Sequence, residues 1–439
     1  MKKTLAPLLA TLTAAALLTT SACSNSDDSK SDSSSTAGAG KVALTYWSWA
    51  PNMDKVVEGW NSTHPDIQVT VNKQDGGDPA VTKLLTAIKA GSGAPDVMQA
   101  EYQKIPTLVS ADALADIAKE AGSLKDKFPA AAWNSVTLGS EAVYGVPQDA
   151  GPLMFFYRSD VFEKNGLQAP KTWDDYAAAA EKIHKANPKQ YLGTFSATDA
   201  GLFTGLAQQA GASWWGVNGD SWTVNINDAA TQKVAAYWGG LVEKGTIDNK
   251  PMYTPEWNAA LNDGTQVGWV SAVWAPGVLE GSAKDTKGKW KAAPMPQWDA
   301  ASPATGNWGG SATSVTSQSK HPKEAAEFIA WLNSDPAALK LLAGTANVYP
   351  AATDAAGVLT TPPAFFAGQA DFYTIAAEAG RQAKPFTYGP NVNVAYSAFN
   401  DAFGKAAESK KAAAFTESLV TMQKATVDDM KNNGFTVAG

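Results

Sequence analysis

Two spacings of hydrophobic residues alternate in the part of the chain that follows residue 40. Residues 42–46 are rich in β-prone side chains, and residues 67–71 alternate between apolar and polar positions, so both segments predict strands. Apolar residues recur at helical spacing over 53–60, a second helix is expected over 79–90, and residues 96–98 are expected to form a third strand. The order strand, helix, strand, helix, strand indicates a parallel, layered α/β domain.

The same alternation continues to the end of the chain. Further strands are expected over residues 143–146, 153–158, 267–274 and 311–316. Further helices are expected over residues 173–185, 228–244, 322–332 and 412–431, with Thr172 and Asn227 as the caps of the first two. Roughly 400 residues follow the first forty, which is enough for two domains with cores of their own.

Residues 1–22 have the composition of a secretory signal peptide. Lys2 and Lys3 form a short positive segment, and residues 5–18 form an apolar run that is too short to span a bilayer. Small residues then precede Cys23, which is the one cysteine of the chain and therefore has no intrachain disulfide partner. We expect removal of the signal peptide just before this cysteine.

Cys23 and the residues before it resemble a bacterial lipobox, whose cysteine is lipidated after cleavage. One position departs from that motif, because Thr20 stands where leucine is usual. The alternative is an ordinary signal peptide that is cut near Ala22 and leaves a free thiol. Residues 24–40 hold no aromatic or branched apolar residue, so 23–40 is predicted to be a lipidated cysteine with a flexible tether.

The composition limits the kinds of partner. The formal net charge is −7 and no segment forms a basic stripe, so nucleic acid is not an expected partner. Arginine, which commonly grips anionic groups, occurs only at Arg158 and Arg381, and this scarcity favours a neutral ligand. Tryptophan is abundant, with 16 residues, and indole rings stack well on flat apolar faces of ligands.

Several stretches carry recognisable motifs. Residues 153–167 are an aromatic-rich strand followed by a Phe-centred turn and Gly-Leu, and residues 169–175 read Ala-Pro-Lys-Thr-Trp-Asp-Asp at the start of a helix. Residues 268–276 are a strand with tryptophan near its end, and residues 308–310 and 319–326 look like a crossover strand and its helix. Together they resemble the family 1 extracellular solute-binding proteins of ABC sugar transporters, the group that includes maltose-binding protein. Tryptophan-rich lipoproteins that bind cellobiose and other β-linked oligosaccharides look nearest.

That resemblance implies an α/β, two-lobed periplasmic-binding-protein-like fold of type II, with the ligand held between the lobes. The chain would cross between the lobes three times, at hinge crossings near residues 147–151, 308–312 and 348–351. The first lobe would combine residues 41–150 with 308–350, and the second would combine 151–307 with 351–439. The expected motion is closure of the lobes by hinge bending.

A sugar-binding cleft needs an aromatic plate for the C–H face of the ring and a few carboxylates or amides for the hydroxyl groups. Trp274, at the predicted end of a strand, is expected to project into the cleft. Trp308 precedes Gly309, where the missing side chain would let a ligand approach the backbone closely. Trp214 and Trp215 follow a Gly-Ala-Ser loop, and at least one of them is expected to stack on the ligand.

Further candidates come from strand ends and crossings. Strand alternation would place Trp47 and Trp49 on one face, where we expect one to reach the cleft and the other to be core. Asp149 lies on the first expected crossing, where the family commonly places a hydroxyl-binding carboxylate; the alternative is a turn-capping aspartate. The remaining candidates for the cleft are Gln99, Glu101 and Trp257, followed by Asp75, Tyr349 and Asn391.

Three classes of function compete. The resemblance implies a binding protein that captures a neutral oligosaccharide, with a β-linked gluco-oligosaccharide such as cellobiose favoured, and delivers it to the permease subunits of an ABC transporter. The alternatives are a secreted carbohydrate-active enzyme and a binder of another solute, such as a peptide or a metal complex. Neither a catalytic nor a metal-binding motif is recognisable, so we expect no enzymatic activity and no cofactor. We also expect a monomer that Cys23 anchors at the extracellular face of the membrane, in a Gram-positive cell.

Overall fold

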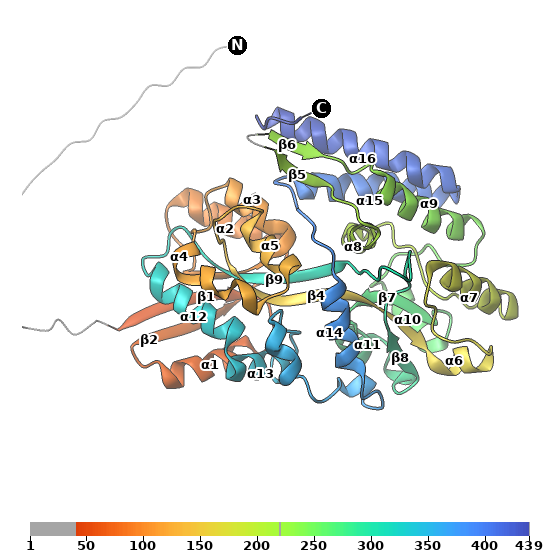
Figure 1. Ribbon diagram of the computed structural model, residues 1–439, viewed down its shortest axis with the longest axis horizontal. Helices are drawn as coiled ribbons and strands as arrows, with labels where there is room; N and C mark the ends of the chain where they lie inside the picture. Colours follow the sequence, from red (N-terminus) through yellow and green to blue (C-terminus); the bar gives the residue numbers. More distant parts are fainter. Residues whose placement is uncertain (1–40, 219–220, 439) are drawn as a thin grey trace, which may run out of the picture. The chain divides into compact units, whose positions relative to one another are not determined.

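The computed structural model describes residues 41–218 and 221–438. The predicted signal peptide, Cys23 and the tether lie outside the described residues. The first elements are β1 (Val42–Ser48), α1 (Met53–Thr63), β2 (Ile67–Lys73), α2 (Asp78–Ala90), β3 (Val97–Glu101), the 3-10 turn η1 (Tyr102–Lys104), α3 (Ile105–Ser110), α4 (Ala118–Ala121), η2 (Gly122–Lys127) and α5 (Ala130–Thr137). Strand β4 (Val146–Arg158) follows, and the chain then leaves this group of elements (Figure 1).

The second group is larger and mostly helical. It contains α6 (Ser159–Lys164), α7 (Trp173–Ala186), α8 (Ala200–Ala210), β5 (Trp215–Asn218), β6 (Ser221–Val224), α9 (Ala229–Glu243), α10 (Pro255–Asp263), β7 (Gly268–Ala272), α11 (Ala275–Ser282), η3 (Lys284–Thr286) and β8 (Trp290–Ala293). Strand β9 (Asn307–Val315) leads back to the first group, where α12 (Pro322–Ser334) and α13 (Pro336–Gly344) follow. The chain ends with η4 (Thr353–Gly357), η5 (Ala364–Phe366), α14 (Phe372–Gln382), α15 (Val392–Ser409) and α16 (Ala412–Asn432).

A seven-stranded sheet joins the two groups. Its strand order is β2-β1-β3-β9-β4-β7, and β8 also pairs with β4. Strand β1 is parallel to β2 and β3, whereas β9 is antiparallel to β3 and β4 is antiparallel to β9, β7 and β8. The expected parallel βαβ start is therefore present, and an antiparallel pair, β4 and β9, continues the sheet beyond it.

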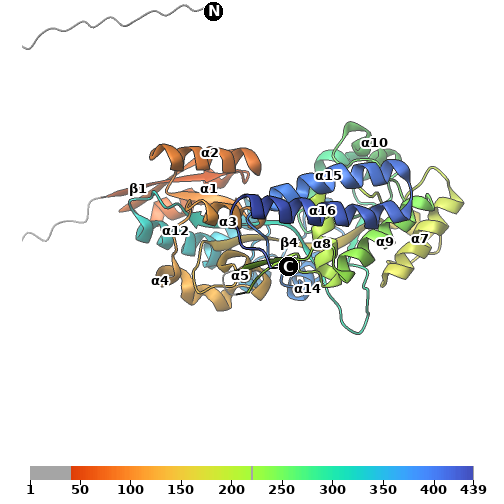
Figure 2. The ribbon, with the colours of Figure 1, turned by 90° about the horizontal axis from the view of Figure 1, so that it is seen from above.

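Two separate hydrophobic cores lie on either side of the β4–β9 pair. The first is built from β1, β3, α1, α2, α3, α5, α12 and α13, and we call the elements around it the first lobe. The second is built from the last half of β4 together with β7, β8 and helices α6 to α11 and α14 to α16, and we call this the second lobe. Figure 2 shows α15 and α16 side by side in the second lobe. Among the described residues, no helix combines the length and apolar character that a membrane span requires.

Strand β4 corrects the prediction of two short strands over 143–146 and 153–158. It runs without a break through residues 147–152, with shifts in its register against β9 between Pro147 and Asp149 and between Ala150 and Pro152. Gly151 lies in the second shift, where a Cβ atom would be 2.1 Å from the carbonyl oxygen of Trp308. Pro147 and Gly151 therefore mark irregularities within one paired strand, because β9 supplies hydrogen-bond partners along the whole segment.

Helix boundaries follow local capping chemistry. Thr172 caps α7 as predicted, and with Asp175 it forms a reciprocal capping box. The predicted cap Asn227 is wrong by one residue, because Asp228 accepts a hydrogen bond of 2.6 Å from the backbone N–H of Thr231 at the start of α9. The strand predicted over 267–274 ends at Ala272 in β7, and the chain then turns into α11.

Candidate ligand-binding cleft

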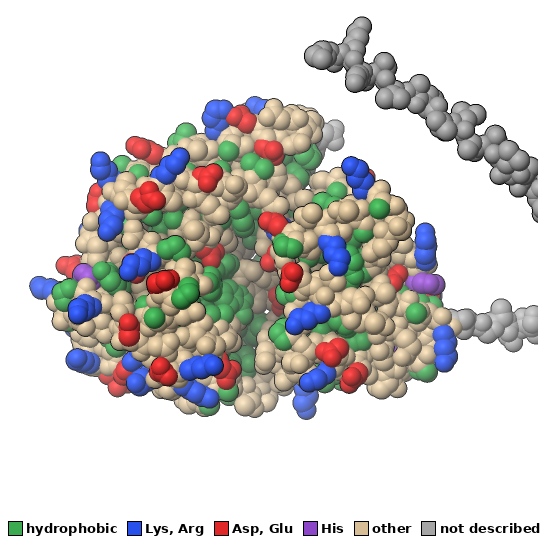
Figure 3. All heavy atoms as spheres, turned by 180° about the vertical axis from the view of Figure 1, so that it is seen from behind, with side chains coloured by type: hydrophobic (Ala, Val, Ile, Leu, Met, Phe, Trp, Pro, Cys, Tyr) green, Lys and Arg blue, Asp and Glu red, His purple; other side chains and the backbone are tan. Residues whose placement is uncertain are grey.

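A cleft lies between the two lobes, beside the strands that join them (Figure 3). Its inner part is a cavity of about 220 Å³, whose lining residues are Trp49, Glu101, Asp149, Ala150, Trp274, Gly310, Ser311, Asn347, Val348 and Tyr349. Five of the residues that the sequence singled out thus come together from five separate parts of the chain: Trp49, Glu101, Asp149, Trp274 and Tyr349. We call this space the inner cavity.

Three segments of backbone form the base of the inner cavity. Strands β4 and β9 pair from Val146 to Pro152, and residues 348–351 run beside β4. The N–H of Ala150 donates to the carbonyl oxygen of Tyr349 over 3.1 Å, and the N–H of Ala351 donates to that of Gln148 over 3.1 Å. The base is therefore a hydrogen-bonded three-segment bridge between the lobes.

Asp149 is held in place by a chain of polar side chains. Gln99 Nε2 donates to Ser311 Oγ over 3.0 Å, and Ser311 Oγ in turn donates to Asp149 Oδ2. Gln99 Oε1 accepts from Ser48 Oγ over 2.7 Å, which ties this chain to the end of β1. Gln99 is 1% exposed and does not line the cavity, so its role is to orient Ser311 and, through it, Asp149.

The carboxyl groups of the cleft are half-buried and partly shielded from solvent. Burial raises the pKa of Asp149 to about 7, although its hydrogen bonds from Ser311 oppose the shift. Burial also raises the pKa of Glu101, and the Lys104 ammonium partly offsets that effect. Both groups can accept hydrogen bonds from ligand hydroxyls when ionised, and Asp149 changes charge near neutral pH.

Trp49 forms one aromatic wall of the inner cavity. It follows the last residue of β1, and its ring lies against Gly76, where a Cβ atom would come within 3.3 Å of the indole. The loop that holds Gly76 continues to Gly77, whose φ is +68°. A Cβ atom at Gly77 would lie 3.8 Å from Glu101 Oε2. Glycine at these two positions lets the loop approach the indole and the carboxylate closely.

Trp274 forms the opposite aromatic wall. It is the N-cap residue of α11, and its Nε1 donates a hydrogen bond of 2.9 Å to the carbonyl oxygen of Trp308. The Trp308 ring packs edge-on against it, with 4.8 Å between ring centroids. Trp269 packs behind both rings at 5.9 and 6.4 Å. The plate presented by Trp274 is therefore fixed by a hydrogen bond and by packing, which reduces the entropy that a ligand must remove.

Gly309 and Gly310 allow the backbone of β9 to pass close to the rings of Trp274 and Tyr102. Their φ values are +77° and +99°, and residues other than glycine rarely adopt such backbone conformations. A Cβ atom at Gly309 would lie 3.6 Å from Trp274 Nε1, and one at Gly310 would lie 2.7 Å from the Tyr102 ring. Gly310 lines the cavity, whereas Gly309 supports the tryptophan.

The structure places other predicted residues away from the cavity. Trp214 and Trp215 are 0% and 1% exposed in the second core, where Trp214 Nε1 donates to Thr231 Oγ1, so the expectation that one of them stacks on ligand is not retained. Trp257 is 4% exposed and packs on Trp269, with 5.1 Å between centroids. These tryptophans enlarge the core and do not form ligand plates.

Four further candidates do not line the inner cavity. Trp47 is 8% exposed and carries the Lys83 ammonium 4.6 Å from its ring, so it packs in the first core toward α2, whereas Trp49 lines the cavity. Trp308 is 8% exposed and acts as support for Trp274. Asn391 Nδ2 donates to the carbonyl oxygen of Thr426 in α16 and does not line the inner cavity. Asp75 is exposed and is also outside the lining.

Sequence reasoning missed residues that line the cleft or pack on the aromatic cluster behind the Trp274 plate. Ser311 and Asn347 line the inner cavity, and Asn347 has a φ of +52°. Tyr253 has a φ of +63°, is 46% exposed, and lies 6.2 Å from both Trp269 and Trp308 by ring centroids. Positive φ in a non-glycine residue is uncommon and concentrates at functional sites, but no sequence pattern announces it.

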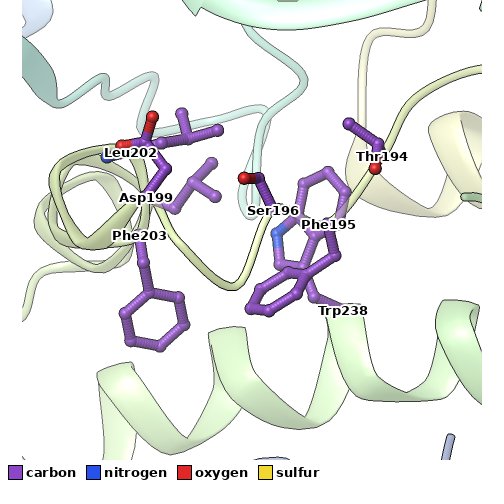
Figure 4. A pocket seen from close by; sticks show the side chains of 8 residues that line it. Thr194, Phe195, Ser196, Asp199, Leu202, Phe203 and Trp238 are labelled. Carbon is purple, nitrogen blue, oxygen red and sulfur yellow. Dashed lines mark hydrogen bonds between the residues drawn. The ribbon is translucent and has the colours of Figure 1, made fainter. Parts of the chain in front are cut away.

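Another enclosed space lies inside the second lobe and is unsuited to a solute. Figure 4 shows its wall, with Asp199 at the start of α8 and Phe203 one turn later. Its volume of about 10 Å³ is close to the room that one water molecule needs. Asp199 caps α8 by accepting from the N–H of Leu202 over 2.9 Å, and burial raises its pKa to about 6. Within residues 41–218 and 221–438, no group of three His, Cys, Asp or Glu side chains is arranged to hold a metal ion.

Known proteins share the sequence pattern and the fold of this chain. Residues 46–339 match the bacterial extracellular solute-binding protein family, which is more than half of the chain. The chain belongs to this family. Members bind solutes and do not catalyse reactions, so the predictions of a solute-binding protein and of no enzymatic activity are confirmed.

Relatives of this solute-binding protein cover most of its length. The arabinooligosaccharide-binding protein of Bacillus subtilis (strain 168) is 27% identical over 311 residues, which are 68% of this chain and 70% of that protein. The galacto-N-biose/lacto-N-biose I-binding protein of an ABC transporter from Bifidobacterium longum, solved with lacto-N-biose, is 32% identical, with a TM-score of 0.79 over 91% of this chain and 99% of that one. The ABC-transporter-associated binding protein of B. animalis subsp. lactis Bl-04, solved with β-1,6-galactobiose, is 28% identical, with a TM-score of 0.76 over 91% and 100%. The predicted α/β periplasmic-binding-protein fold is confirmed.

Proposed function

We propose that this solute-binding protein captures a short neutral oligosaccharide outside the cell and delivers it to the permease of an ABC transporter. The single observation that carries the proposal is the inner cavity, where the Trp274 plate and the Asp149 carboxyl line one space between two lobes. An indole can cover the C–H face of a sugar ring while a carboxylate accepts its hydroxyl hydrogens. The saccharides named with the three relatives support the same class of ligand.

The identity of the sugar is a finer proposal. The relatives are named for arabino-oligosaccharides or were solved with lacto-N-biose and β-1,6-galactobiose, whereas cellobiose was favoured from the sequence. All four are short neutral saccharides, and a cleft with two aromatic walls and two carboxyl groups suits each of them. The proposed ligand is therefore a neutral oligosaccharide, with these four as the first to be tested.

Capture also requires a moving part and an anchor. We assign the lobes to residues 41–150 with 308–350 and to 151–307 with 351–439, and the bridge at 348–351, β4 and β9 acts as the hinge. Ligand that contacts both lobes binds the closed form more tightly, and this difference in affinity drives closure. Cys23, once lipidated, would hold the protein at the outer face of the membrane.

The test is titration calorimetry with the four saccharides, on the mature chain and on Trp274→Ala. Removing the plate should weaken binding of the preferred sugar by at least ~2 kcal/mol, as truncation of a central aromatic contact does. Trp222→Ala is the matched control, because Trp222 is a half-buried tryptophan of β6 that does not line the inner cavity. Unchanged affinity in Trp274→Ala would refute the assigned plate.

A second measurement separates binding from catalysis. Labelled saccharide is incubated with the protein overnight and then recovered by chromatography. Recovery of intact saccharide is expected, and turnover that follows the purified protein would contradict the proposal.

A further inference from the structure

The inner cavity continues past Trp274 into a second cavity. This outer cavity has a volume of about 180 Å³ and shares four lining residues with the inner one, which are Trp274, Asn347, Val348 and Tyr349. Its own walls come from α11 and α14, with Glu280 on the first and Tyr373 on the second. The two cavities therefore form one groove, with the Trp274 indole along its middle.

The outer cavity has the chemical features of a sugar site in its own right. Tyr349 and Tyr373 form a stacked pair, with 6.2 Å between ring centroids and 18° between ring planes. Both phenols are protonated at neutral pH and can donate hydrogen bonds, and burial raises the pKa of each still further from neutral. Glu280 is exposed at the edge of the cavity and supplies an acceptor. Flat rings, hydroxyl donors and a carboxylate again occur together.

We propose that the outer cavity is a second saccharide subsite, so that the preferred ligand is a chain of at least three units that extends past Trp274. This inference rests on the proposed function and deepens it by naming the length of the ligand. One end of the chain lies beside Asp149 in the inner cavity, and a later unit lies against the Tyr349–Tyr373 pair. Tyr373 sets the length preference because it lines the outer cavity and is absent from the lining of the inner one.

The experiment measures affinity against chain length. Calorimetry is performed with arabino-oligosaccharides and with β-linked gluco-oligosaccharides of two, three and four units, using the full mature chain. The wild type should bind the three-unit member of the preferred series roughly tenfold more tightly than the two-unit member, since an added aromatic contact is typically a gain of this size. Tyr373→Ala should lose that gain and bind the two-unit member with its affinity unchanged within about twofold.

Two variants guard against a loss of folding. Tyr373→Phe keeps the ring and should retain most of the length preference. Tyr191→Ala removes a half-buried tyrosine that stacks on His184 and lines neither cavity, and it should behave as the wild type. Thermal melting of each variant shows whether it is folded.

The outcomes are distinguishable. Equal affinity for two and three units in the wild type overturns the outer subsite and leaves the proposed function intact. An equal loss for all lengths in Tyr373→Ala also overturns it, because the residue would then act on the inner cavity or on the fold. Absence of binding at every length, in both series and with the saccharides named above, overturns the proposed function and this inference with it.

Discussion

Asp149 shows how one residue combines structural and binding roles. Its carboxyl lies at the floor of the cleft, accepts a hydrogen bond from Ser311, and is positioned through Gln99 from the end of β1. A half-buried carboxyl that ionises near pH 7 is costly for the fold and useful for a ligand that donates hydrogen bonds. Carboxyl groups with strongly shifted pKa values are typical of binding and catalytic sites.

The raised pKa of Asp149 has a consequence for stability. The folded protein keeps the proton up to about pH 7, whereas the unfolded chain releases it near its ordinary value of 3.8. Raising the pH from about 4 to 7 therefore lowers the free energy of unfolding of the wild type, and the loss is complete above pH 7. Asp149→Asn has no such group, so its stability relative to the wild type should rise by about 1 kcal/mol or more between pH 5 and pH 8.

Urea denaturation of both proteins at the two pH values measures this difference. Asp199, whose pKa is also raised, is present in both proteins and cancels in the comparison, whereas Glu101 interacts with Asp149, so the measured difference includes the interaction of that pair. A difference that is independent of pH would show that Asp149 ionises normally in the folded state.

At the scale of single residues, the sequence predicted some of the residues that line the cleft and missed or misplaced others. Trp49, Glu101 and Asp149 follow or lie on strands that meet at the cleft, so strand ends alone bring them together. Trp214 and Trp215 also follow a loop in the sequence, but they are core residues. Trp214 packs on Phe203 of α8 and on Phe386 and donates a hydrogen bond to Thr231 of α9, and Trp215 packs closely on Gly389. Tyr253 reaches the aromatic cluster through a backbone conformation that no local pattern reveals.

At the scale of elements, the junction between β4 and β9 controls the geometry of the cleft. Two register shifts lie within this pair, and glycines occupy the tightest points on both strands. The sequence predicted the strands on either side of the junction but placed a break at residues 147–152, because Pro147 and Gly151 are turn residues in isolation. The segment is a continuous strand because it pairs with β9, which lies far away in the sequence. The spacing of hydrophobic residues does not reveal such long-range pairing.

Gly151 should be intolerant of substitution. A Cβ atom there would meet backbone atoms of Trp308 at 2.1 and 2.9 Å, so Gly151→Ala must separate β4 from β9 or distort both. We expect a loss of ~2 kcal/mol or more in the free energy of unfolding by urea titration. Gly344→Ala, where no atom lies within 4 Å of the added methyl group, is the control and should change stability little. Similar stability of the two variants would mean that the β4–β9 contact is not tight in solution.

At the scale of the whole molecule, the two lobes are joined by hydrogen bonds between side chains and backbone as well as by the hinge, as far as residues 41–218 and 221–438 show. Lys104 of the first lobe donates to Asp78 Oδ1 over 2.6 Å within its own lobe and to Asn393 Oδ1 of α15 in the second. Thr107 Oγ1 donates to the carbonyl oxygen of Pro390 over 2.8 Å. The Lys104 side chain is 7% exposed, so this contact holds a shielded charge. Separation of the lobes would break the two hydrogen bonds that join them, Lys104–Asn393 and Thr107–Pro390.

Removing the Lys104 contact should therefore favour the open form. Lys104→Met keeps the length of the side chain and loses the charge and the donors, which should cost the closed form about 1 kcal/mol. The dissociation rate of the bound saccharide, measured by stopped-flow fluorescence, should rise roughly fivefold. Lys424→Met removes an exposed lysine that pairs with Asp428 along α16, and it should leave the rate unchanged. A rate that is unaffected in Lys104→Met would show that the lobes stay closed without this contact.

The most direct test of the account is a crystal structure of the mature protein with its preferred oligosaccharide. The account predicts one saccharide chain in the groove between the lobes, with a sugar ring against the Trp274 indole and a hydroxyl within hydrogen-bond distance of the Asp149 carboxyl. Density for the saccharide elsewhere on the protein, or in the groove without contact to either side chain, would contradict it.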